Sequence, residues 1–227
     1  MATRTVCDRV VPMTTTRSHS RLPTRLVLGV LASSAVLAVG AVSPSAGAGA
    51  EGNEHRVVHR DTRADVLLFP EGSATGEPVP DDRATDVITT VVDHRADRLV
   101  VQARVRQLSR SGFRFLVAEV LTSEGKRYQL LVDYSTKPIS RPRVSLARFA
   151  SDAPVSCPGA AWSVDLSTNR VEGSVPTSCL GGPESVRVGV GVISSPRSLT
   201  SSSADDSHTD GRVGDHHLEL GPVQPHA

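Results

Sequence analysis

The chain has 227 residues, and its 25 basic and 24 acidic side chains give a formal net charge of +1. The arginines are scattered and form no block, which argues against nucleic acid and acidic membrane surfaces as partners. Aromatic residues make up only 3% of the chain, which argues against functions that need several stacking platforms, such as RNA binding and many kinds of sugar binding.

A short apolar stretch runs from Leu26 to Val42, after Arg17, Arg21 and Arg25 and before the small residues 46–48. This order of a basic segment, an apolar segment and a small-residue cleavage site is typical of a secretory signal peptide. A transmembrane helix needs about 20 predominantly apolar residues, and this stretch is shorter and contains glycines and serines. We therefore expect a signal helix that is cleaved after Ala48 or Ala50, with no stable membrane anchor afterwards.

The export signal divides the chain into three parts. Residues 1–50 are the signal peptide region, in which Met13 is an alternative start. The polar residues 51–63 are expected to form a flexible arm. Residues 64–227 are expected to form a single domain, because a chain of this length buries enough surface for one core. The mature protein is expected to be secreted.

Two cysteines, Cys157 and Cys179, remain after the signal region and its Cys7 are removed. In an exported protein such a pair is expected to form a disulfide. A zinc site is not favoured, because no histidine lies between the two cysteines and two thiolates alone do not complete a zinc site.

Period-two alternation of apolar and polar residues predicts most of the secondary structure. An edge strand at 66–69 precedes a link rich in proline and glycine, and a long Ser/Asp-rich loop is expected at 194–214. Further strands are predicted at 87–92, 99–105, 113–117, 128–134, 143–149, 162–166, 171–175, 186–192 and 217–220. About nine or ten short strands predict an all-β fold, an antiparallel and jelly-roll-like β-sandwich of two packed sheets.

Three segments resemble a group of uncharacterised secreted proteins from actinobacteria: DVITTVVDH at 86–94, LVVQARV at 99–105 and VPTSCLG at 175–181. More distantly, the first hairpin is similar to the start of the DOMON and family 9 carbohydrate-binding sandwiches. The resemblance implies a secreted β-sandwich. It transfers no functional residue, because haem-binding DOMON members use axial Met and His ligands, whereas Met1 and Met13 both precede the signal. The sugar-binding members use paired tryptophans, and Trp162 stands alone.

Catalytic chemistry finds little support in the sequence. The strained Gly-x-Ser-x-Gly turn that exposes a nucleophile in many hydrolases is absent. His94 lies in a predicted turn between Asp93 and Arg95, where a solvated or turn-stabilising residue is expected and not a catalytic one. An extracellular hydrolase stays an alternative, and it requires His94 or His216 to meet a carboxylate in a pocket.

A late acidic and histidine-rich segment is the best candidate for a metal. Oxygen-rich loops suit Ca²⁺, and imidazoles hold Zn²⁺ or Cu²⁺, but the spacing of Asp205, Asp206 and Asp210 matches no established ligand pattern. A solvated loop is therefore expected, and no cofactor is assigned. If a metal is bound, the candidate ligands are His208, His216 and His217.

Sugar rings stack on aromatic faces, so that Tyr128, Tyr134 and Trp162 are candidate ligand-binding residues. The two tyrosines alternate along the predicted strand in step with Leu130 and Val132, so that all four side chains point to the same face, which predicts that the tyrosines are buried.

We therefore expect a secreted, non-catalytic binding or interaction module whose ligand is an extracellular glycan or protein. A carbohydrate-binding module and an extracellular hydrolase are the alternatives.

Overall fold

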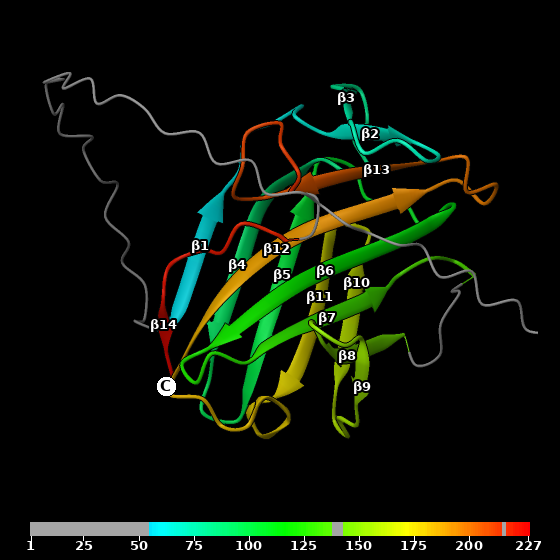
Figure 1. Ribbon diagram of the computed structural model, residues 1–227. Helices are drawn as coiled ribbons and strands as arrows, with labels where there is room; N and C mark the ends of the chain where they lie inside the picture. Colours follow the sequence, from blue (N-terminus) through cyan, green and yellow to red (C-terminus); the bar gives the residue numbers. More distant parts are fainter. Residues whose placement is uncertain (1–54, 138–142, 215–216) are drawn as a thin grey trace, which may run out of the picture. The chain divides into compact units, whose positions relative to one another are not determined.

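The computed structural model describes residues 55–137, 143–214 and 217–227, and from His55 onwards these belong to one compact unit. This part of the chain folds into fourteen strands that form two antiparallel sheets (Figure 1). The predicted signal helix and the segment 138–142 lie outside the described residues. Within the described ranges no helix is long and apolar enough to span a membrane.

The first sheet has five strands in the order β1-β4-β5-β11-β10. Their bounds are β1 (Arg56–Arg60), β4 (Val87–His94), β5 (Arg98–Val105), β11 (Arg170–Pro176) and β10 (Ala161–Asp165). Strand β1 corrects the prediction of a flexible arm at 51–63, because residues 56–60 pair with 89–93 of β4 along their whole length. Strand β4 would otherwise leave backbone amide and carbonyl groups unpaired at the sheet edge. The polar residues of β1 form hydrogen bonds with these groups, and this gain does not depend on apolar side chains.

The second sheet has nine strands in the order β3-β2-β13-β12-β6-β7-β8-β9, with β14 also paired to β12. Their bounds are β2 (Leu67–Pro70), β3 (Glu77–Pro78), β6 (Phe113–Thr122), β7 (Arg127–Asp133), β8 (Val144–Arg148), β9 (Ala153–Val155), β12 (Ser185–Ser195), β13 (Ser201–Asp206) and β14 (Gln224–Pro225). The fold class is therefore as predicted, with more strands than the nine or ten expected.

The Ser/Asp-rich segment 194–214 is not the continuous loop that its composition predicts. Strand β12 extends to Ser195, and β13 pairs with β12 on one side and with β2 on the other. Pairing on both sides satisfies the backbone of a serine run that has no strand preference of its own. The strand at 66–69 is consequently internal and not an edge. No strand forms at the described residues 217–220, and β14 pairs with β12 further along the chain.

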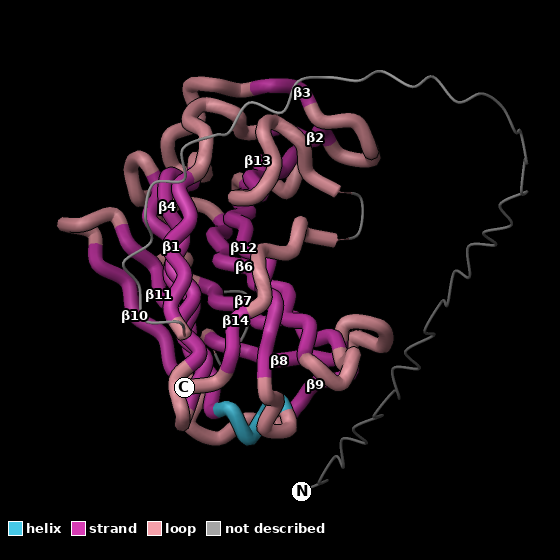
Figure 2. Tube along the Cα trace, turned by 90° about the vertical axis from the view of Figure 1, so that its left-hand side faces the viewer, coloured by secondary structure: helices cyan, strands magenta, loops and turns pink. Residues whose placement is uncertain are grey.

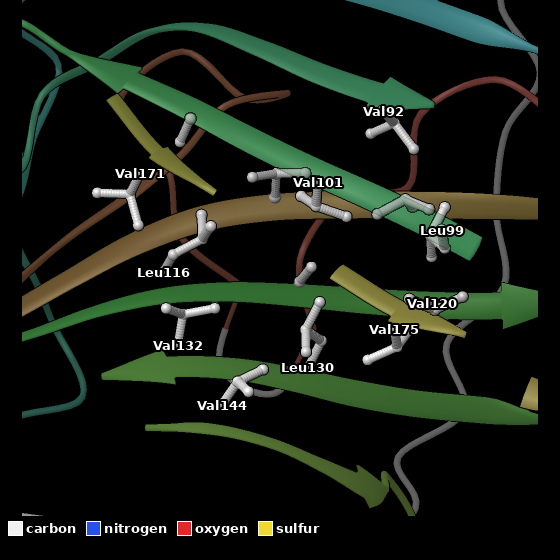
Figure 3. Packing of buried hydrophobic residues seen from close by; sticks show 14 of the residues in the cluster. Val92, Leu99, Val101, Leu116, Val120, Leu130, Val132, Val144, Val171 and Val175 are labelled. Carbon is white, nitrogen blue, oxygen red and sulfur yellow. The ribbon is translucent and has the colours of Figure 1, made fainter. Parts of the chain in front are cut away.

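The core lies between the two sheets, where the inner side chains of β5 and β11 face those of β6, β7 and β12 (Figure 3). Gly173 shows how closely the sheets approach, because a Cβ atom there would lie 2.5 Å from Cγ2 of Val132. Tyr128 and Tyr134 are buried, which confirms the prediction from their parity. The helical segment η1 (Thr177–Leu180) lies at the end of the sandwich away from β2 and β3 (Figure 2).

The predicted disulfide between Cys157 and Cys179 is confirmed, with Cα atoms 5.5 Å apart. It joins the segment that precedes β10 to η1, which follows β11, so that the two ends of the β10–β11 hairpin are held together. Both cysteines pack against the core.

Replacing both Cys157 and Cys179 with alanine is expected to lower the free energy of unfolding by about 3 kcal/mol, because the bond closes a loop in the unfolded chain. Urea unfolding of the variant and of the oxidised wild type measures the difference. Equal unfolding midpoints and slopes would contradict a structural role for the bond.

The C-terminal segment crosses the outer face of the second sheet over two glycines of β12. A Cβ atom on Gly189 would lie 2.7 Å from the backbone oxygen of Glu219, and one on Gly191 would lie 2.9 Å from Cδ2 of Leu218. The backbone amide of Leu218 also donates to Glu119 Oε2 at 3.3 Å. The glycines thus let this segment lie directly on the sheet.

Gly189→Ala is expected to destabilise the protein by about 1–3 kcal/mol, because the methyl group meets backbone that does not move without lifting the C-terminal segment. Ser163→Ala on the exposed strand β10 is the control, with an expected change within about 0.5 kcal/mol. Urea unfolding compares the two variants. Unchanged or increased stability of Gly189→Ala would show that the segment does not hold this position.

Candidate functional site

Five aspartates from three distant segments converge near one end of the sandwich. Asp61 and Asp65 lie in the link between β1 and β2, Asp86 directly precedes β4, Asp205 belongs to β13, and Asp210 lies in the loop that follows. Carboxylate oxygens of Asp61, Asp65 and Asp210 lie within 4.8 Å of one another, and so do those of Asp65, Asp86 and Asp205. Asp65 belongs to both groups, so the five carboxylates form one continuous cluster, which we call the aspartate cluster.

Backbone amides from neighbouring segments hold three of these carboxylates in place. Asp205 Oδ2 accepts a hydrogen bond from the amide of Val87 at 2.7 Å. Asp86 Oδ2 accepts one from Ala64 at 3.1 Å, and Asp65 Oδ2 accepts one from Gly211 at 3.1 Å. These bonds connect the start of β4 to β13, the link 61–65 to the residue before β4, and the loop at Gly211 to the link 61–65.

Burial and mutual repulsion disfavour the charged forms of these carboxyl groups. Desolvation, and then the charge of Asp65, raises the pKa of Asp61 to about 8. Burial, together with the charges of Asp61, Asp65 and Asp86, raises the pKa of Asp205 to about 8 as well. Burial also raises the pKa of Asp86, although Arg106, with Nε 2.9 Å from its Oδ2, acts in the opposite direction. The aspartate cluster therefore favours uptake of positive charge, as protons or as a cation.

The sequence pattern identifies only the late members of this cluster. Asp205 and Asp210 stand out as oxygen ligands in an acidic segment, whereas Asp61, Asp65 and Asp86 are more than 100 residues away in the chain. The sequence signal for the distant members is that single aspartates stand beside predicted strand ends. This signal identifies the cluster only when the strand order of both sheets is known, because that order decides which strand ends lie close together.

The predicted histidine ligands do not come together among the described residues. His208 stacks on His59 with ring centroids 4.3 Å apart, and burial together with His59 lowers its pKa to about 4. His217 stacks on Phe149 instead, and His216 lies outside the described residues. In this part of the chain, the groups close enough to share a metal ion consist only of aspartates.

His217 belongs to a charged network that fastens the C-terminal segment to the second sheet. Glu119 is buried, with Oε1 2.8 Å from Nη1 of Arg127 and Oε2 3.3 Å from Nδ1 of His217. A buried carboxylate is tolerated when it is paired and hydrogen-bonded in this way. The network therefore serves the structure.

A cleft of about 590 Å³ lies between the turn joining β2 to β3 and the C-terminal segment. Leu67 and Phe69 provide apolar surface in it. Its polar side chains are those of Thr75, Asp206, Thr209, Arg212, His217 and Glu219. Both oxygens of Asp206 accept backbone hydrogen bonds, from His208 at 3.2 Å and from Glu219 at 2.8 Å.

The three aromatic candidates do not form a common platform. Tyr128 and Tyr134 are buried in the core at 5% and 0% exposure, whereas Trp162 on β10 is 36% exposed. The guanidinium of Arg143 lies over the Trp162 ring, with Cζ 5.0 Å from its centroid. Trp162 is therefore the one of the three that reaches solvent.

His94 is fully buried at the end of β4, which corrects the prediction of a solvated turn histidine. Its ring packs edge-on against His226 at 4.9 Å between centroids, and its backbone oxygen accepts a hydrogen bond from Ala227. The C-terminal residues cover it, which the local sequence did not reveal. A substrate does not reach this histidine.

No protein-family model matches the sequence, and neither a curated protein nor a solved structure is significantly similar to it. The function is therefore inferred from the geometry of the aspartate cluster, the cleft and the exposed tryptophan.

The pKa of His94 is lowered, first by burial and also by the charges of His226 and His55. The unfolded chain therefore binds a proton at this residue at a higher pH than the folded chain, so the contribution of His94 to stability falls as pH decreases through about 6.5. The free energy of unfolding of wild type minus that of His94→Gln is expected to fall between pH 8 and pH 5.5. A pH-independent difference in urea unfolding would contradict this.

Proposed function

We propose that the protein is a secreted, non-catalytic binding module whose ligand occupies the cleft between the β2–β3 turn and the C-terminal segment. The order of basic, apolar and small residues before position 51 supports export. The Cys157–Cys179 disulfide is compatible with an oxidising compartment.

The observation that carries the proposal is the cleft of about 590 Å³ with its mixed lining. Sites for small ligands measure roughly 300–1,000 Å³ and combine apolar surface with a few polar groups. Here Phe69 and Leu67 supply the apolar surface, and Arg212 and Glu219 supply charge of both signs at the rim. Such a lining suits a polar extracellular ligand, a glycan chain or a peptide segment.

The contacts of the polar groups in the cleft support binding in preference to proton transfer. Burial raises the pKa of Asp206 to about 6, which would suit a general acid. Its two oxygens, however, are occupied by the amides of His208 and Glu219. His217 is likewise engaged with Glu119 and Arg127. These contacts support a binding role.

A carbohydrate-binding module with its site at Trp162 is the second candidate. The 36% exposure of Trp162 favours it, because an aromatic face at the surface stacks on a sugar ring. The guanidinium of Arg143 lies over one face of this ring, so that a sugar would stack on the opposite face.

Retention of the secreted protein on insoluble cell wall, chitin and cellulose tests the proposal. The cleft predicts that Arg212→Ala weakens retention by at least about ten-fold, as loss of a well-placed charged contact does. Arg104→Ala, on the exposed face of β5, is the matched control and is expected to bind as wild type. Loss of retention in Trp162→Ala but not in Arg212→Ala would favour the second candidate. Absence of retention on all three materials would contradict a glycan ligand at either site.

Incubation of the same glycans with the protein, followed by assay of new reducing ends, tests the non-catalytic part of the proposal. No release above the level of a heat-denatured sample is expected. Release that is lost in Asp206→Asn would overturn it and favour an extracellular hydrolase.

A further inference from the structure

From the geometry of the aspartate cluster we infer that the protein binds a Ca²⁺ ion, with Asp65, Asp86 and Asp205 as ligands and Asp61 and Asp210 adding negative charge beside it. Ligand oxygens lie 2.3–2.6 Å from Ca²⁺, so two oxygens on opposite sides of one ion are separated by about 4.6–5.2 Å. Oxygens of the three ligands all lie within 4.8 Å of one another. They therefore fit around one ion without rearrangement of the backbone.

A buried carboxylate oxygen without a hydrogen-bond partner is a second, independent observation that points to a bound cation. Asp86 is 0% exposed, and its Oδ1 has no hydrogen-bond partner within the described part of the chain. The same holds for Oδ1 of Asp65 and Oδ2 of Asp61, which are also buried. Buried polar atoms in folded proteins are almost always satisfied. One bound cation explains the unsatisfied oxygens of the two proposed ligands Asp86 and Asp65, and its charge also favours the buried carboxylate of Asp61 beside it.

The arginines near the cluster do not balance its charge. Arg106 forms an ion pair with Oδ2 of Asp86 at 2.9 Å, and Arg63 lowers the pKa of Asp86 from a greater distance. Both arginines act on Asp86, and among the described residues Oδ2 of Asp205 accepts its hydrogen bond from an uncharged donor, the amide of Val87. A divalent ion supplies the charge that the side chains lack.

The ligand chemistry favours Ca²⁺ over other biological cations. All ligands are carboxylate oxygens, which are hard donors, and Zn²⁺ or Cu²⁺ would favour nitrogen or sulfur. Mg²⁺ requires near-octahedral geometry at 2.0–2.1 Å and keeps several of its waters. A buried set of carboxylates from three separate segments forms a larger and less regular cage, which suits Ca²⁺.

The position of the cluster gives the ion a structural role. Asp65 lies in the link that leads from β1 in the first sheet to β2 in the second, Asp86 directly precedes β4 of the first sheet, and Asp205 belongs to β13 of the second. These strand ends meet near one end of the sandwich (Figure 1). The ion would therefore join the two sheets there, as the disulfide joins the two ends of the β10–β11 hairpin. This role is independent of the ligand in the cleft.

Calorimetric titration with CaCl₂ of the secreted protein, after treatment with EDTA and desalting, tests the site. Saturable binding of one Ca²⁺ per chain and a higher thermal unfolding midpoint in Ca²⁺ than in EDTA are expected. MgCl₂ is expected to bind more weakly. No heat and no change in midpoint up to about 10 mM Ca²⁺, above the dissociation constants of weak extracellular modules, would overturn the inference.

Variants identify the ligands. Asp65→Asn is expected to weaken Ca²⁺ binding by at least about ten-fold, because even groups that only support a metal ligand contribute that much. Asp81→Asn, an exposed aspartate outside the cluster, is the matched control and is expected to bind as wild type. If Asp65→Asn does not fold, the exposed Asp210→Asn replaces it, with a smaller loss expected. Equal affinity of the cluster variant and the wild type would overturn the assignment.

Discussion

The burial of one valine-rich face of each sheet against the other is the constraint on which the rest of the structure depends. Apolar burial of this kind is the main driving force of folding, and the sheets leave so little space that a methyl group on Gly173 would lie 2.5 Å from Val132 Cγ2. Once the inner faces are fixed, the strand ends are fixed too. The aspartates beside those ends are thereby brought together although they are distant in the chain.

The structure treats its buried carboxylates in two different ways. Glu119 on the outer face of the second sheet is paired with Arg127 and accepts the amide of Leu218, so that its burial helps to hold the C-terminal segment in place. Asp86 has an oxygen without a hydrogen-bond partner in the described part of the chain and lies among other carboxylates. We infer that the first serves stability, because both oxygens of Glu119 lie beside Arg127 or His217, and that the second binds a cation, because Arg106 pairs with only one oxygen of Asp86.

The sequence predicted those features that depend on local alternation. The fold class, the burial of Tyr128 and Tyr134 and the Cys157–Cys179 pair follow from parity and from the expected compartment. Strands β1 and β13 were missed, because their polar residues become strands only through pairing with neighbours. The burial of His94 and the aspartate cluster were missed for a related reason: both depend on segments more than 100 residues apart, which only the strand order of the sheets brings together.

We infer that the aspartate cluster receives a cation, because among the described residues its carboxylates are close enough to share one ion and several of their buried oxygens have no hydrogen-bond partner. Amide chemical shifts measured by NMR during addition of Ca²⁺ to metal-free protein report directly on where the ion binds. We expect the largest changes at Ala64, Val87 and Gly211, whose amides donate to Asp86, Asp205 and Asp65. Shifts that are absent, or that centre instead on His208 and His217, would contradict a cation site in the cluster.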